Sequence, residues 1–187
     1  MTCIAGLVHE NTVWIAGDSA VTYAEGVVRH PGGKVFALGE FVLGCAGHVR
    51  GAEIVRHAFE PPAIGADLDG YMHITFVDAL RRAFRESGFL TYQQGQERTE
   101  TTLLVGVRGR LYGISGNFNV YADAHPWLTI GDGAPQALGA LYATSCASLE
   151  PEARLRLALE AAAYYTKTVR PPFTVLCSSS AYPRSNP

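Results

Sequence analysis

The stretch from Thr2 to Ala20, TCIAGLVHENTVWIAGDSA, contains two short apolar runs separated by Glu10 and Asn11. The runs at residues 3–9 and 13–18 are rich in apolar and β-branched side chains, a composition typical of strands. A polar pair that includes Asn between two such runs predicts a β-hairpin turn. We therefore expect the fold to open with two paired strands.

Thr2 directly follows Met1, and a threonine side chain is small enough for an aminopeptidase to remove the methionine. Removal would leave a hydroxyl and a free α-amine on one residue, a nucleophile and a base. An α-amine has an ordinary pKa of about 7.7 to 8.0, so it can take up and return a proton near neutral pH. Many ordinary proteins also begin with Met-Thr, so this signal alone is weak.

Two further polar residues strengthen the signal: Asp18 in Gly-Asp-Ser-Ala and Lys34 in Gly-Lys-Val-Phe. Only two of the fifteen basic residues are lysines, Lys34 and Lys167. Because lysine is rare in this chain, its occurrence at this position is informative. A lysine cation would keep a nearby amine neutral, and an aspartate would hold the lysine in place. The ordinary alternatives are a solvated surface lysine and an aspartate that caps a turn.

Several segments together resemble proteasome β-type subunits and the bacterial HslV peptidase, which are N-terminal nucleophile (Ntn) hydrolases. The resembling segments are residues 2–6 (TCIAG), 16–22 (AGDSAVT), 34–35 (KV), 43–47 (LGCAG) and 130–137 (IGDGAPQA). The resemblance spans most of the chain and weakens between about residues 61 and 99 and in the last ten residues. It implies an α+β fold, the four-layer αββα sandwich, as one domain over residues 1–177 with a loose tail at 178–187.

The resemblance also implies a catalytic set. Thr2 would be the nucleophile and its α-amine the general base, supported by Asp18 and Lys34. The backbone N–H of Gly44, expected in a glycine-lined turn before a helix near His48, would stabilise the oxyanion, because glycine lets main chain approach a substrate closely.

Three residues are expected to bind the substrate by the same resemblance. Thr22 matches the position that hydrogen-bonds the substrate backbone, and Val21 and Ala46 would help to shape the first specificity pocket. No cofactor is implied. The six histidines show no HExxH-type spacing, so we expect no catalytic metal.

Two positions depart from the family pattern. Asp132 stands where the family usually has a serine, and an ungapped alignment places Tyr164 where it usually has an aspartate in the late helix. One interpretation is a decayed, inactive site. The other is compensation, in which Asp132 supplies the lost carboxylate and raises the pKa of the amine. A turn aspartate between two glycines is the ordinary alternative.

Further elements follow from hydrophobic periodicity and from Gly and Pro breaks. Strands are predicted at residues 34–38, 40–45, 101–107, 111–115, 127–130 and 173–177. Helices are predicted at 49–59, 72–84, 134–145 and 152–169. Strands grouped as hairpins, with helices in pairs, favour stacked layers over alternating βαβ units. Periodicity alone predicts only a mixed α/β protein.

Composition narrows the class of protein. A length of 187 residues fits one domain, and a net charge of -2 argues against a nucleic-acid partner. No apolar run is long enough to span a bilayer and no signal peptide is evident, so we expect a cytoplasmic protein without a membrane partner. The four cysteines form no CxxC pair and are expected to be reduced and mostly buried.

Three functions remain open at this stage. The first is a threonine-dependent peptidase that acts on peptides or unfolded proteins within a homo-oligomeric ring, with a possible ATPase partner. The second is an amidase or transpeptidase on the same scaffold. The third is an inactive structural or partner-binding subunit, because a fold alone does not determine function.

Overall fold

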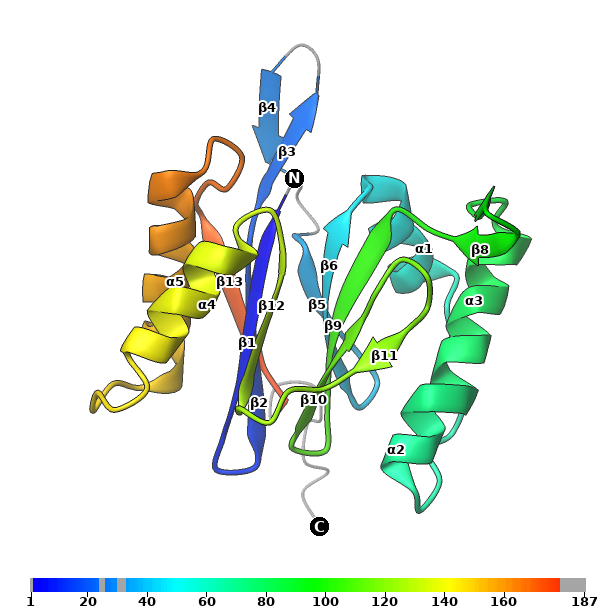
Figure 1. The fold of residues 1–187 in the computed structure, drawn as a ribbon, viewed down its shortest axis with the longest axis horizontal. Helices are drawn as coiled ribbons and strands as arrows, with labels where there is room; N and C mark the ends of the chain where they lie inside the picture. Colours follow the sequence, from blue (N-terminus) through cyan, green and yellow to red (C-terminus); the bar gives the residue numbers. More distant parts are fainter. Residues whose placement is uncertain (1, 24–25, 30–32, 179–187) are drawn as a thin grey trace.

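The computed structural model describes residues 2–23, 26–29 and 33–178. Two antiparallel sheets pack face to face in its centre (Figure 1). The first has the strand order β12 (Trp127–Gly131), β1 (Cys3–His9), β2 (Thr12–Asp18) and β13 (Phe173–Cys177). The second has the order β11 (Val120–Tyr121), β10 (Arg110–Ile114), β9 (Thr101–Val107), β6 (Phe41–Gly47) and β5 (Val35–Leu38).

Helices cover the outer face of each sheet (Figure 1). The helices α4 (Ala134–Ala143) and α5 (Pro151–Tyr165) pack on the first sheet. The second sheet is covered by α1 (Val49–His57), α2 (Leu68–Gly70), the π-helical turn η1 (Tyr71–Phe76) and α3 (Val77–Glu86). The predicted four-layer αββα sandwich is therefore confirmed.

Three apolar clusters hold the layers together. One lies between the two sheets and is built on Ile4, Ile15 and Leu104. The other two lie between each sheet and its helices. Burial of apolar area on both faces of each sheet is the main stabilising contribution to such a fold.

The opening hairpin forms as predicted. Glu10 and Asn11 have φ angles of 47° and 60°, the pair of positive values that a type I′ turn requires. The strands that it connects pair from Ile4 with Gly17 to His9 with Thr12. This register places Thr2 and Asp18 at the same end of the hairpin, away from the turn.

Several predicted boundaries differ from the structure. The strand predicted at 40–45 runs to Gly47, because its pairing with β9 continues to Thr101. The helix predicted at 72–84 begins with η1 and continues as α3 to Glu86. The helix predicted at 152–169 ends at Tyr165, since Thr166 has extended backbone angles.

Two hairpins were not predicted from the sequence. The strands β3 (Ala20–Tyr23) and β4 (Gly26–Arg29) form one that projects from the end of the sandwich where Thr2 lies (Figure 1). The strands β7 (Thr91–Gln93) and β8 (Gln96–Arg98) form the other, beside α3. None of the helices in the described part of the chain is long and apolar enough to cross a membrane.

Candidate active site

Three segments that are distant in sequence meet at one end of the sandwich. Thr2 directly precedes β1, Asp18 ends β2, and Lys34 directly precedes β5. All three side chains belong to buried residues, with Asp18 only 1% and Lys34 only 8% exposed. The structure thus brings together three of the residues that the sequence singled out.

Asp18 and Lys34 form a buried ion pair. The Lys34 Nζ donates to both carboxylate oxygens of Asp18, each at 2.9 Å. A buried charge is costly unless it is paired and hydrogen-bonded, and here both charges are paired. Lys34 is therefore not the solvated surface lysine of the ordinary alternative.

Asp18 also fixes the backbone around the N-terminus. Its Oδ1 accepts the N–H of Cys3 at 3.0 Å, and its Oδ2 accepts the N–H of Ala20 at 3.2 Å. The same carboxylate thus positions both Lys34 and the residue that follows Thr2. On the other side, the Thr2 carbonyl accepts the N–H of Gly133 at 3.3 Å.

Burial lowers the pKa of Lys34 below its ordinary value of 10.5, while the Asp18 carboxylate opposes this shift. Asp132 contributes a smaller effect in the same direction as Asp18. The Lys34 cation therefore loses its proton at a lower pH than a solvated lysine does.

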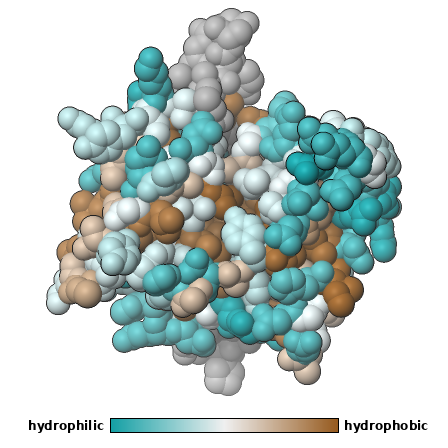
Figure 2. All heavy atoms as spheres, in the orientation of Figure 1, coloured by the Kyte–Doolittle hydropathy of each residue, from teal (hydrophilic) through white to brown (hydrophobic). Residues whose placement is uncertain are grey.

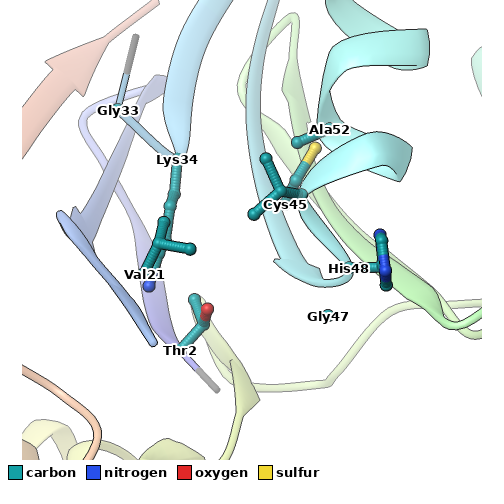
Figure 3. A pocket seen from close by; sticks show the side chains of 9 residues that line it. Thr2, Val21, Gly33, Lys34, Cys45, Gly47, His48 and Ala52 are labelled. Carbon is teal, nitrogen blue, oxygen red and sulfur yellow. The ribbon is translucent and has the colours of Figure 1, made fainter. Parts of the chain in front are cut away.

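A small cavity of about 30 Å³ opens beside Thr2 (Figure 3). The Thr2 hydroxyl points into the space between Val21 and Cys45, and the Lys34 side chain extends toward the same place. The described residues that line the cavity are Thr2, Val21, Gly33, Lys34, Cys45, Gly47, His48, Val49 and Ala52. Val21 thus lines the cavity beside Thr2, and its contact with a substrate stays a prediction.

The prediction that Gly44 lies in a turn before the helix is wrong. Gly44 lies in the middle of β6, where it pairs with Val35 and Leu104, and a Cβ there would clash with Ile4 of the facing sheet. A glycine is required at position 44 because the two sheets approach closely at this point.

Gly47, at the end of β6, lines the cavity where Gly44 does not. It ends β6 with a φ of 108°, and a Cβ there would clash with the Glu100 carbonyl oxygen, so only glycine fits. The next residue, His48, caps α1 by accepting the N–H of Arg50 on its ring nitrogen Nδ1 at 3.2 Å. Gly47 therefore lies at the positive N-terminal end of α1, which favours negative charge.

Ala46 is not among the described residues that line this cavity, and its contact with a substrate stays a prediction. Successive side chains of a strand point to opposite faces, so Ala46 packs into the core between the sheets while Cys45 lines the cavity. Sequence reasoning missed Cys45 because residue alternation could not be assigned to a face without the strand register. The backbone of Thr22 pairs with Val27 in the β3–β4 hairpin, but its side chain lies outside the described part of the structure, as does Met1.

Asp132 lies beside the N-terminal segment, since its neighbour Gly131 pairs with Cys3. Its side chain is exposed, and its Oδ2 accepts the hydroxyl of Thr168 at 3.4 Å. That Asp132 orients the α-amine stays a prediction. Tyr164 is 82% exposed and contacts Tyr165, and the residue that approaches Asp132 is Thr168, which follows the end of α5.

Arg56 on α1 is a further residue that sequence reasoning missed. Its Nη2 donates to the carbonyl oxygen of Gly33 at 3.0 Å, and its guanidinium lies 4.3 Å from the ring centroid of Phe36. Arg56 thus connects α1 to Gly33 and Phe36, which flank Lys34 and Val35 in the sequence. In the sequence it looks like any cation on the polar side of a helix.

The cysteines are all free, and three of the four are buried, as predicted. Within residues 2–23, 26–29 and 33–178, no three His, Cys, Asp or Glu side chains gather closely enough to hold a metal ion.

No protein-family model matches the chain. The ATP-dependent protease subunit HslV of Petrotoga mobilis is 28% identical over 144 residues, which cover 76% of each protein.

Solved structures show the same fold. BPH from Thiobacillus denitrificans in complex with epoxomicin matches with a TM-score of 0.79 at 22% identity, over 94% of this chain and 97% of that one. HslV from Trypanosoma brucei matches with a TM-score of 0.68 at 22% identity, over 94% and 98%. Anbu from Yersinia bercovieri matches with a TM-score of 0.68 at 14% identity, over 94% and 81%. The chain is therefore a homologue of the protease subunit HslV, with the fold of the HslV- and proteasome-like Ntn hydrolases.

Proposed function

We propose that the chain is a threonine-dependent peptidase whose nucleophile is Thr2, exposed by removal of Met1. The observation that carries this proposal is the buried Asp18–Lys34 ion pair beside Thr2, at a cavity that Thr2 itself lines. A buried ion pair contributes little net stability compared with apolar residues of similar volume, so a chemical role accounts for it better.

The proposed reaction begins with the free α-amine of Thr2. The Lys34 cation disfavours a second positive charge nearby, which keeps this amine unprotonated near neutral pH. The amine accepts the hydroxyl proton of Thr2 as Oγ1 attacks the carbonyl carbon of the substrate amide. The amine then returns the proton to the leaving nitrogen as the C–N bond breaks, which leaves an ester on Thr2. Water, activated by the same amine, hydrolyses that ester.

We assign the oxyanion of the tetrahedral intermediate to the N–H of Gly47, in place of Gly44. The position of Gly47 in the cavity wall, at the N-terminal end of α1, supports this assignment. Because the donor is a backbone group, its position depends on the left-handed φ of Gly47, which a substitution would strain.

We further propose a homo-oligomeric ring in the cytoplasm that degrades peptides or unfolded proteins, with an ATPase as a possible partner. The description of the Petrotoga relative as ATP-dependent supports the ATPase. Apolar side chains gather over α4 and α5 (Figure 2) and support burial of this face in an assembly. The exposed large hydrophobic residues on these helices are Leu138, Tyr142, Leu157, Tyr164 and Tyr165.

Peptide hydrolysis by variants of Thr2 tests the proposed function. Thr2→Ala should lower kcat/KM by at least about 10³-fold, as expected for loss of a nucleophile, and Thr2→Ser should retain part of the activity. Thr12→Ala is the matched control, because Thr12 lies at the far end of the same hairpin. Full activity in Thr2→Ala would contradict the proposal. Inactivity of the unaltered protein with Met1 removed would favour a structural subunit instead.

A further inference from the structure

The helix α1 begins with a histidine as its capping residue. His48 has extended backbone angles, and its ring nitrogen Nδ1 accepts the N–H of Arg50 at 3.2 Å. Its carbonyl oxygen accepts the N–H of Gly51 at 3.0 Å. The usual caps are serine, threonine, aspartate and asparagine, whose side-chain oxygens accept such an N–H throughout the neutral pH range. A histidine can do so only while one ring nitrogen carries no proton.

The hydrogen bond assigns the tautomer of the His48 ring. The donor is a backbone N–H, so Nδ1 is the acceptor and the proton of the neutral ring lies on Nε2. Protonation of Nδ1 would place two N–H groups opposite each other and break the bond. It would also place a cation at the N-terminal end of α1, which already carries partial positive charge. Both effects remove the cap when the ring becomes an imidazolium.

The first turn of α1 depends on this cap. It contains no acidic residue, and all of its residues belong to the described part of the chain. Four charged residues surround the ring on the neighbouring elements: Arg50 and Glu53 on α1, Lys34 at the same cavity, and Glu100 before β9. The Glu53 carboxylate lies 3.7 Å from Arg50, and Lys34 is paired with Asp18. The contact that the structure gives Glu100 is through its backbone carbonyl, which accepts the N–H of His48 at 3.4 Å.

The cap lies next to the backbone group assigned to the oxyanion. Gly47 directly precedes His48, and both residues line the cavity beside Thr2 (Figure 3). The Glu100 backbone confines Gly47 on one side, since a Cβ there would clash with the Glu100 carbonyl oxygen. The ring of Phe89 packs on the imidazole with centroids 5.5 Å apart, which limits rotation of the imidazole. The cap thus fixes the direction in which the chain leaves Gly47.

We propose that His48 is a positioning residue, which holds the Gly47 N–H in the cavity wall through the cap of α1 and releases it when the ring is protonated. The His48 side chain is exposed, so protons from solvent reach it. Histidine as a residue type changes its charge between about pH 5 and 8. Turnover should therefore fall in acid for a second reason, besides protonation of the Thr2 amine. This inference rests on the proposed function, because it takes Gly47 as the oxyanion donor.

The ratio of kcat/KM in His48→Asn to that in the unaltered protein tests the inference. Protonation of the Thr2 amine affects both proteins and cancels in this ratio. Asparagine caps a helix through its side-chain oxygen and does not titrate. Whatever its value at about pH 8, the ratio should rise about 10-fold by about pH 5.5, less than the roughly 10² to 10³ for complete loss of an oxyanion donor, because the N–H is only displaced.

Replacement by alanine removes the cap at every pH. His48→Ala should lower kcat about 10-fold at about pH 8, with a smaller change in KM, since the oxyanion forms only during the reaction. The matched control is His57→Asn, which makes the same replacement as the test variant at the exposed C-terminal end of α1. Its ratio to the unaltered protein should not change with pH.

Hydrogen exchange followed by mass spectrometry gives a readout that does not depend on turnover. At about pH 5.5 the amides of residues 47–52 should be less protected in the unaltered protein than in His48→Asn, and at about pH 8 the two proteins should protect them equally.

Three outcomes would overturn the inference. A kcat/KM ratio that does not change with pH, or equal protection of residues 47–52 at about pH 5.5, would overturn it and leave Thr2 as the nucleophile. Activity of His48→Asn as low as that of His48→Ala at every pH would do the same, because it would mean that the ring acts on the substrate directly. Absence of peptide hydrolysis, with no Thr2 adduct from a vinyl sulfone, would overturn the proposed function and with it the role of Gly47.

Discussion

Among the described residues, Asp18 is the single residue that makes the most hydrogen bonds between the segments of the site. One carboxylate receives the Lys34 ammonium and the N–H groups of Cys3 and Ala20, so it joins three chain segments. Such a group could be predicted from the sequence, because its short motif and its spacing from Thr2 are local features. Gly47 and Cys45 could not, since their positions depend on contacts with Glu100 and Leu103 far along the chain.

Lys34 should be required for turnover. Lys34→Ala should lower kcat by at least about 10²-fold, the scale for loss of a group that supports acid–base catalysis. Lys34→Arg should not restore activity, because a planar guanidinium does not fit the site of a compact ammonium. Lys167→Ala, which removes the other, exposed lysine, is the control. Circular dichroism should show that the variants remain folded, and unchanged turnover in Lys34→Ala would mean that the ion pair is only structural.

The pH dependence of turnover should reflect the buried lysine. The pKa of Lys34 is lowered by burial, so its protonated form, which the proposed reaction needs, is lost below the ordinary lysine value of 10.5. Activity should therefore decline at alkaline pH before 10.5 is reached. Stability should change in the opposite direction: the unfolded chain binds the proton more tightly than the folded chain, so this group favours folding as pH rises through that window. Rate profiles combined with thermal unfolding at each pH separate the two effects, and activity that persists above pH 10.5 would contradict the assignment.

The strands and helices show which local patterns suffice and which do not. The strands at 101–107 and 173–177 lie where apolar and β-branched runs predict them. The predicted end of the last helix at residue 169, just before Pro171 and Pro172, is wrong, because the β-branched Thr166 already leaves the helix. The β3–β4 hairpin lacks a strong turn signal.

The helix α1 should position the catalytic lysine through Arg56. Arg56→Ala removes the hydrogen bond to Gly33 and the packing on Phe36, so the start of β5 should be less well held. We expect kcat to fall about 10-fold, a loss of about 1.4 kcal/mol in transition-state stabilisation, with a smaller change in KM. The alkaline limb of the pH profile should also move, which a remote loss of stability would not cause.

Arg50→Ala is the control for this prediction, because Arg50 lies on the same helix with an exposed side chain that faces Glu53. Arg56→Lys should restore only part of kcat, since lysine cannot both stack on the ring and reach the carbonyl in the same fork geometry. Equal effects of Arg50→Ala and Arg56→Ala would show that α1 has no specific positioning role.

The molecule as a whole has a four-layer architecture that the family resemblance implied and that hydrophobic periodicity alone did not. Its surface over α4 and α5 exposes apolar side chains that a single chain leaves in water. Light scattering of the purified protein should give a mass of about six or more subunits, as expected if the chain forms a closed ring. Leu138→Glu with Leu157→Glu should reduce this mass if the face is buried in the assembly, and a monomer at high concentration would contradict the ring.

Covalent labelling followed by intact-protein mass spectrometry tests the central claim most directly. Protein from its native host would be treated with peptide vinyl sulfones that end in Ala and in Leu, and the labelled peptide would then be sequenced. The proposed function predicts a mass that lacks Met1 and carries one inhibitor, with the adduct on Thr2. Peptide hydrolysis by a chain that retains Met1, or an adduct on any other residue, would contradict it.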